Sequence, residues 1–532
     1  MKIIKSTYGL FVASLAALSL TSCNDFLDTN PDNRTTINTE DKAVALLTSA
    51  YPRSNFALVT ELSSDNIVDL GENNPYTERF YDEVFSWKDI TETDNDDTQH
   101  FWDASYSSVA AANMALEAIE EMGATTAKLE EAKAEALLCR AYNEFMLVNM
   151  FCKHYDSKTA DKDLGVAYPL KPASKLFSPV ERGTVAEVYA QIDKDIQEAL
   201  PLIGDSHYTQ PKYHFNTQAA YAFATRFYLY YEQPEKAIKY ATLCLGSSPK
   251  TMLRDYSYIA SMPQGDEGRE AIENHYIDAS LNCNLMLVST TSYLGLIFNP
   301  YRYMNRYSHA QWVGTHEDLN AKNIWGNSKA YAGLMDYSGS NSDKSIFWRV
   351  PLSTETIDPV AGTGYMHSVM PILTSDECLL NRAEAYVLAK QYDKATADIN
   401  LWIQNFIKNA ATFTTDSIVK FYNGVGYSYD KNELTSTIKK HLHPSFEIDA
   451  EGSVQEAMLQ CVLELRRIET MQLGLRWFDI KRYGIVIPRT QLNAAGNPAK
   501  VTDWLTVDDE RRAFQIPQKV RDAGVAPNPR TK

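Results

Sequence analysis

Apolar residues recur at intervals of three and four along much of this chain, the spacing that lines up side chains on one face of an α-helix. One such stripe, within residues 129–152, consists of Leu138, Ala141, Phe145, Val148 and Cys152. A second stripe lies within residues 184–203, where charged residues separate the apolar positions. Stripes of this kind are typical of helices that pack against a core, and they predict a mainly α-helical protein.

Two segments share a longer pattern, in which an aromatic residue is followed nine residues later by alanine and four residues later again by an apolar residue. The pattern occurs at Tyr228, Ala237 and Ala241 and again at Tyr386, Ala395 and Ile399. Each segment predicts a helix, a short turn and a second helix, an arrangement that resembles the tetratricopeptide repeat. Because such units bury their faces only by stacking, we expect further helices of the array at 128–152 and 182–203.

The helical pattern fades in three aromatic-rich zones, residues 60–100, 250–373 and 409–450. Long irregular segments on a helical scaffold usually carry function or pack on the scaffold as excursions. The helical scaffold would therefore cover about 39–250 and 373–484, and irregular insertions would cover about 60–100 and 250–373.

The N-terminus has the features of an export signal. Lys2 and Lys5 precede a 12-residue apolar run, which as a helix would be roughly 18 Å long, too short for a bilayer core of about 30 Å. The run ends at Leu20-Thr21-Ser22-Cys23, which resembles the lipobox of bacterial lipoproteins. We expect a signal peptide at 1–22, lipid attachment at Cys23 and a tether at 23–38. The alternative is a cleaved secretion signal with a chance cysteine.

Composition narrows the classes of function. The formal net charge of -17 argues against a nucleic-acid-binding protein, which needs a basic face to neutralise phosphate. No later stretch approaches 18 consecutive apolar residues, so no membrane span is expected in the mature chain. The six cysteines after Cys23 form no C-x-x-C pair. We expect them to be mostly buried free thiols, although disulfides remain possible in an exported protein.

A search for catalytic and metal-binding motifs is negative. The chain has no G-x-S-x-G, H-E-x-x-H, Walker A or G-x-G-x-x-G motif. Residues 94–97, DNDD, begin like a calcium loop but lack its later glycine and glutamate, and we expect a solvated acidic loop. His441 and His443 have no clear third ligand. We therefore expect no enzyme, no metal site and no cofactor.

Several segments, in this order, resemble the SusD/RagB family of outer-membrane lipoproteins. They include TSCNDFLDTNPDN, FWDASYSSVAAANMALEAI, RAEAYVLAKQYDKATADINLW and ELRRIETMQLGLRWFDIKRYG. The resemblance runs from Cys23 to about Gly484. The sequence departs from the family pattern at Leu473-Gly474, where Glu-Gly is usual. The resemblance implies one domain over residues 39–532, a tetratricopeptide-like helical scaffold with an irregular, loop-rich subdomain whose insertions at about 60–100 and 250–373 bind the ligand. It also implies that Trp102, Tyr106, Asn113, Arg476, Trp477 and Asp479 are structural.

The resemblance also implies a function. Proteins of this family sit on the cell surface, held in the outer membrane by acyl chains such as palmitate. They form a lid over a SusC-like, TonB-dependent transporter. They bind nutrient oligosaccharides or polysaccharides and deliver them to the transporter without catalysis. Two alternatives stay open, a peptide-binding RagB-like lipoprotein in the same kind of complex and an envelope scaffold that binds no small ligand.

In sugar-binding members of such a family, variable loops supply aromatic platforms, because a ring face covers the C–H face of a sugar while polar side chains bind its hydroxyl groups. The matching zones here are 76–87 and 293–331. Each aromatic residue in them could also be a packed loop anchor. The candidate ligand-binding residues are Trp87, Tyr293, Trp312 and Trp325, with Tyr301 and Tyr307 behind them, and the polar residues Asn305, Arg306, Asn323 and Asn327.

Overall fold

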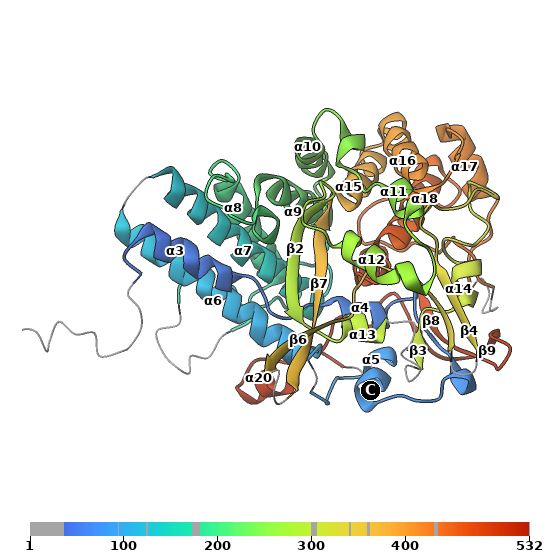
Figure 1. The fold of residues 1–532 in the computed structure, drawn as a ribbon, viewed down its shortest axis with the longest axis horizontal. Coiled ribbons are helices and arrows are strands. Elements are labelled where there is room, and N and C mark those ends of the chain that lie inside the picture. The colour runs from blue at the N-terminus through green and yellow to red at the C-terminus, as the bar shows by residue number, and fades with distance from the viewer. Residues whose placement is uncertain are drawn as a thin grey trace, which may run out of the picture.

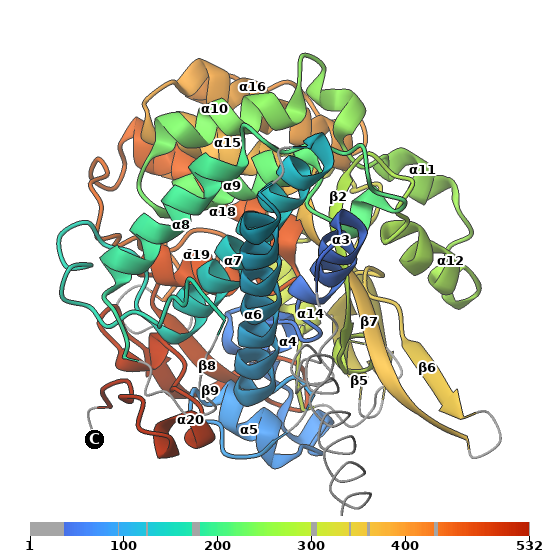
Figure 2. The same ribbon diagram turned by 90° about the vertical axis from the view of Figure 1, so that its left-hand side faces the viewer.

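The computed structural model describes residues 37–530 apart from 94, 124–125, 173–180, 299–305, 340–341, 359–361 and 430–434. The signal peptide, Cys23 and most of the tether therefore lie outside the described residues, as do Tyr301 and Asn305. Figures 1 and 2 show helices gathered along one side of the molecule and short sheets with irregular connections on the other. The prediction of a mainly α-helical protein with a loop-rich part is confirmed.

The N-terminal half of the scaffold is a run of helices that pack in sequence order. Neighbouring helices contact one another from α6 to α7 and from α7 to α8, and α3 lies on α6 and α7. Thr184 is the N-cap of α8 and forms a reciprocal capping box with Glu187. The helices of this half are α3 (Glu40–Leu47), α4 (Ala57–Ser63), α5 (Arg79–Phe85), α6 (Thr98–Met122), α7 (Ala127–Phe151) and α8 (Val185–Ala199).

The two predicted repeats are both present. The first is α9 (Thr217–Tyr230) with α10 (Pro234–Leu245), and the second is α15 (Ser375–Leu388) with α16 (Tyr392–Phe406). The predicted small residues Ala237, Ala241 and Ala395 have no exposed surface, which lets the paired helices approach. Helix α10 also packs on α15, so the two repeats stack although more than a hundred residues separate them.

The remaining helices complete the array or lie within the irregular part. Helices α17 and α18 pack on each other, and α18 also contacts α15. Lys481 of α19 donates hydrogen bonds to the carbonyls of Asn149 and Cys152 at the C-terminus of α7. These helices are α11 (Tyr256–Ser261), α12 (Asp266–Tyr276), α13 (Leu294–Ile297), α14 (Gln311–His316), α17 (Thr415–Asn423), α18 (Val454–Thr470), α19 (Arg476–Arg482) and α20 (Gln518–Asp522).

In the part of the chain that the structure describes, the strands form three small sheets, which the fading of helical periodicity did not predict. One sheet has the order β3-β1-β8-β9, in which β1 is parallel to β8 and the other neighbours are antiparallel. A second has the order β2-β7-β6, and β4 pairs with β5. The strands are β1 (Val68–Asp69), β2 (Asn284–Thr291), β3 (Tyr307–Ser308), β4 (Met335–Gly339), β5 (Ser342–Ile346), β6 (Ser353–Asp358), β7 (Thr363–Thr374), β8 (Ile487–Leu492) and β9 (Pro498–Leu505).

One hydrophobic core runs through the helical array and continues under the irregular segments. A smaller cluster around Val68, Val313 and Leu492 lies on the β3-β1-β8-β9 sheet. The six cysteines of the described chain are buried and unpaired with one another in disulfides, so they behave as the predicted free thiols. Within the residues that the structure describes, no helix combines the length and apolar character that crossing a membrane requires.

Candidate functional site

Arg306, a predicted polar site residue, is held at the edge of the β3-β1-β8-β9 sheet. Its guanidinium donates two hydrogen bonds to the Asp69 carboxylate, with Nε–Oδ1 and Nη2–Oδ2 distances of 2.7 and 2.8 Å. Gln491 of β8 donates to the same carboxylate at 2.8 Å. The side chain of Arg306 keeps 29% of its surface exposed, so the sheet fixes a partly open donor. Sequence analysis missed Asp69 and Gln491, because neither lies near Arg306 in the chain.

Trp312, a predicted platform, is half-buried on the short helix α14. Its ring stacks on that of His316, one turn later, with centroids 4.8 Å apart and an angle of 18° between the planes. Its inner side packs against the small cluster that includes Val313 and Leu492. We call Trp312 and His316 the ring pair. His316 was not predicted, although its spacing of four residues from Trp312 on a helix was a usable signal.

Three other aromatic residues predicted to bind the ligand, the platforms Trp87 and Trp325 and, behind them, Tyr307, are covered in this structure. Trp87 is 4% exposed, donates through Nε1 to the Ser63 carbonyl at 2.9 Å and lies under the Arg489 guanidinium. Tyr307 is 6% exposed and stacks on Phe85 with centroids 4.1 Å apart. Trp325 is 7% exposed and belongs to the main core. These rings anchor loops to the scaffold, the alternative that the sequence left open, and their faces are not open platforms.

Tyr293 lies on a different part of the molecule, next to α13, which packs on β7. Its backbone N–H donates to Asp96 Oδ2 at 2.7 Å, and the neighbouring Ser292 hydroxyl donates to Asp96 Oδ1 at 2.5 Å. Asp96 and Asp97 are 1% and 3% exposed, and Asp97 caps α6. The expectation of a solvated acidic loop was therefore wrong for both residues, because their carboxylates bind backbone and hydroxyl donors inside the fold.

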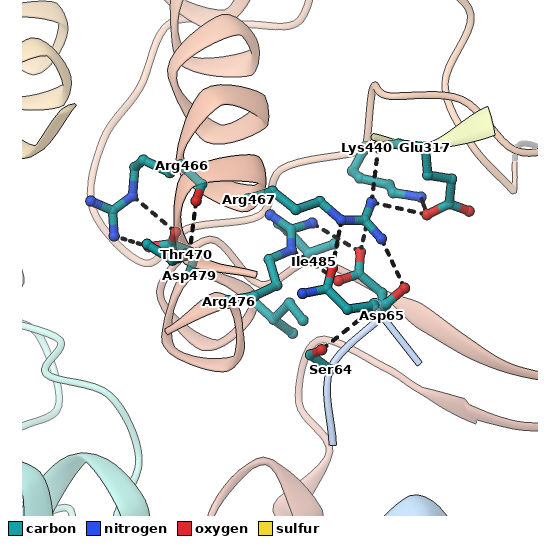
Figure 3. Close-up of polar contacts among 12 residues, drawn as sticks. Ser64, Asp65, Glu317, Lys440, Arg466, Arg467, Thr470, Arg476, Asp479 and Ile485 are labelled. Carbon is teal, nitrogen blue, oxygen red and sulfur yellow. Dashed lines mark hydrogen bonds and ion pairs between the residues drawn. The ribbon is translucent and has the colours of Figure 1, made fainter. Parts of the chain in front are cut away.

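A buried ionic network holds Glu317, the residue directly after α14 (Figure 3). Arg476 donates two hydrogen bonds to the Asp65 carboxylate, each 2.9 Å long, and Glu317, directly after α14, accepts from Lys440 at 2.7 Å and from Arg467 at 3.0 Å. Burial opposes ionisation of Asp65 and Glu317, but the surrounding cations outweigh it and lower the pKa of both carboxyl groups. The network joins segments that are hundreds of residues apart in the chain.

The described residues offer no group of three or more His, Cys, Asp or Glu side chains placed to hold a metal ion. The sheet side presents a partly open aromatic pair, an exposed part of an arginine and, on β8, the side-chain amide of Gln491. Ring faces bind apolar C–H surface, and the polar groups bind hydroxyl or carbonyl oxygens.

Comparison with known proteins supports a family. Residues 25–229 match a SusD-like family described as "Starch-binding associating with outer membrane". No curated protein matches the chain in sequence. Among solved structures, a SusD superfamily protein from Bacteroides thetaiotaomicron is 16% identical, with a TM-score of 0.61 over 93% of this chain and 100% of that one.

Two further structures show the same likeness. A SusD-like carbohydrate binding protein from Bacteroides vulgatus is 13% identical, with a TM-score of 0.56 over 91% of this chain and 96% of that one. A laminarin binding SusD-like protein is 14% identical, with a TM-score of 0.53 over 92% and 98%. At such identities the likeness is one of fold. The chain thus shares the fold of SusD-like proteins, a helical-repeat scaffold with a loop-rich side, over most of its length, and residues 25–229 match the SusD-like family in sequence.

Proposed function

We propose that this protein is a lipid-anchored outer-membrane protein of the cell surface that binds glycans and delivers them to a SusC-like, TonB-dependent transporter, for which it serves as the lid. The observation that carries the proposal is the SusD-like fold, shared over most of the chain with proteins described as carbohydrate-binding and laminarin-binding. The family description, with its starch binding and outer membrane, supports the same ligand class and location. The protein acts by binding alone.

The ring pair and Arg306 supply the chemistry for the primary glycan site. A pyranose has one face of C–H groups and a rim of hydroxyl groups. The half-buried ring of Trp312 covers the C–H face by dispersion and by burial of apolar surface. Arg306 and Gln491 donate hydrogen bonds to hydroxyl oxygens. The segment around Tyr76, a residue that is 53% exposed and whose carbonyl accepts a hydrogen bond from the Arg306 backbone N–H at 3.0 Å, extends this surface.

Binding to immobilised polysaccharide tests the proposal. The full chain should be retarded in native gels that contain starch or laminarin. Trp312→Ala should weaken the retardation about tenfold, since loss of about 1.4 kcal/mol is a tenfold change in affinity. Tyr258→Ala removes an aromatic ring that is 52% exposed elsewhere and should bind as the wild type does.

The same experiment distinguishes other outcomes. If neither the wild type nor any variant is retarded by any polysaccharide, the glycan proposal fails. Peptides that co-purify with the native complex would favour the peptide-binding alternative. Shortening of the bound glycan would contradict the proposal that the protein binds without catalysis.

A further inference from the structure

Three surface hollows meet at His443, on the side of the molecule where α18 and the segment before it lie. The largest has a volume of about 880 Å³ and includes His441, His443 and Glu451 in its wall. A second, of about 300 Å³, is lined by both histidines, Trp504 and Thr506. The third, of about 570 Å³, shares His443 with the other two. We call this junction the His443 hollow. Volumes of this order are those of small-molecule sites.

Aromatic rings in parallel planes line the hollow. His441 stacks on Tyr427, with ring centroids 4.1 Å apart and planes 10° apart. His443 follows at 6.3 Å from His441, again nearly parallel, at 18°. His443 is exposed, and its ring nitrogens have no hydrogen-bond partner among the described residues. The half-buried Trp504 stands in the same wall, edge-on to Tyr429. The hollow therefore combines flat ring surface with free polar atoms.

The buried network of Figure 3 contacts this wall through Glu317 and Lys440, which hold Tyr429 in place. Tyr429 has a φ of 58°, an uncommon left-handed conformation for an aromatic residue. Its hydroxyl donates to Glu317 at 2.5 Å, and Lys440 Nζ lies 4.6 Å from the centre of its ring and donates to the same carboxylate. Residues held in such conformations gather at ligand sites, where the surrounding structure fixes them. These contacts hold the ring of Tyr429, and therefore its contact with Trp504, in place before any ligand binds.

The charges around the hollow favour a neutral ligand. Lys390 pairs with Asp449, His441 bonds to Glu451 at 2.6 Å, and Lys158 donates to the Ser445 carbonyl. The cations of the largest hollow are therefore engaged by groups of the protein and offer no cluster of free positive charge to an anion. A polyhydroxyl ligand needs ring faces and single hydrogen-bonding groups, which the hydroxyl of Thr506 and the ring nitrogens of His443 provide.

We propose that the His443 hollow is a second glycan-binding site, in which a pyranose lies against the rings of His443 and Trp504 and bonds to His443 and Thr506. This inference rests on the proposed glycan-binding function but places a separate site. Trp504 pairs with Pro488 at the start of β8, whereas Trp312 packs on Leu492 at its end. At about 3.3 Å per residue the two sites are more than one sugar apart. A polysaccharide that reaches both gains avidity over a short oligosaccharide that reaches one.

Hydroxyl-radical footprinting of the full chain tests the site directly, with maltotriose, laminaritriose, starch and laminarin as probes. We expect a glycan to protect His443 and Trp504 from oxidation, and to do so also in Trp312→Ala. The double variant His443→Ala with Trp504→Ala should be retarded at least tenfold less by the polysaccharide, while the protection of Trp312 persists. His100→Ala, which removes another exposed histidine, is the matched control and should bind as the wild type does.

The outcomes separate the two proposals. Protection of Trp312 without protection of His443 and Trp504 overturns the second site and leaves the proposed function intact. If no probe protects any of the three residues, both fail. If the double variant binds every probe as the wild type does but no longer co-purifies with an outer-membrane barrel, the hollow is a protein contact and the glycan assignment is overturned. Because His443 is exposed, His443→Ala alone repeats the test without risk to folding.

Discussion

At the scale of the residue, this protein holds many ionisable groups inside its core. Glu464 of α18 is 3% exposed, accepts a hydrogen bond of 2.5 Å from the Tyr422 hydroxyl on Oε2, and has no partner for Oε1 among the described residues. Burial raises the pKa of its carboxyl group to about 8. By contrast, Asp65 lies between arginines that keep it ionised. The environment, and not the residue type, decides the protonation state of each carboxyl group.

Glu464 makes the stability of the protein depend on pH. A glutamate in an unfolded chain has a pKa of about 4.3. Between that pH and about 8 the folded protein binds more protons than the unfolded chain, so the free energy of unfolding should fall as the pH rises and level off above that range. Across this range the loss of stability due to Glu464 is on the order of 5 kcal/mol. Glu464→Gln removes the titration and keeps an acceptor for Tyr422.

Urea unfolding of the wild type and Glu464→Gln at pH 5.5 and pH 8.5 measures this effect. The difference in the free energy of unfolding between the two pH values should be clearly smaller in the variant. Glu273, whose pKa burial raises to about 7 and which does not interact with Glu464, titrates in both proteins and therefore cancels in the comparison. Equal losses of stability in both proteins would show that Glu464 is already ionised near neutral pH.

The sequence predicts which loops carry aromatic residues but does not predict which of those rings are exposed. The loops of the predicted zones do carry rings, and Trp312 has the half-open position expected of a platform. Nothing in the residues next to Trp87 or Tyr307 distinguishes them from Trp312. Trp87 is covered because Arg489 of β8 lies over it, and Tyr307 because Phe85 of α5 stacks on it. These partners are set by long-range packing.

At the scale of the element, the stacking of repeats depends on small residues between helices. Helix α10 contacts both α9 and α15, and Ala241 on it has no exposed surface. Interiors are packed as densely as organic crystals, so a side chain at this position has no free volume to enter. The local sequence pattern is enough to form each helix pair. The two pairs can stack only if α10 carries small side chains where α9 and α15 pack against it.

Ala241→Leu should therefore destabilise the protein by about 1–3 kcal/mol through overpacking. Leu243 on the same helix is 50% exposed, and Leu243→Ala is the control, with an expected change within about 0.5 kcal/mol. Thermal and urea unfolding of both variants would measure the difference. Equal stability of Ala241→Leu and the wild type would mean that α10 and its neighbours can separate at little cost.

At the scale of the whole molecule, the proposed anchor at Cys23 precedes the first core residue by twenty positions in the sequence. Cys23 lies outside the described residues, and the core begins with Ala43 on α3. Stable attachment to a membrane generally takes more than one acyl chain, and a lipidated cysteine of the bacterial lipoprotein type carries a diacylglyceryl group. Location and ligand binding should therefore be separable by mutation.

Cys23→Ala should leave the folding of the body unchanged and release the protein from the outer membrane or mislocalise it. Fractionation of cells, followed by protease treatment of intact cells, would measure both attachment and exposure. Cys283→Ala, which removes a buried thiol, is the control and should remain attached. Undiminished attachment of the Cys23→Ala protein would rule out the lipid anchor at this position.

The sequence alone determined the helical pairs. At Tyr228 and Tyr386, spacings of three, four and nine residues predict a helix, a short turn and a second helix that packs on the first. It also indicated the loop-rich zones, where that spacing is lost. Only the tertiary structure decided that α10 meets α15, that Asp69 and Gln491 hold Arg306, and that His441 and His443, set aside as metal ligands, line a hollow with Trp504. The physical reason is the distance along the chain over which each feature is decided. Periodicity is a property of neighbouring residues, whereas burial and side-chain contacts depend on which distant segments pack together.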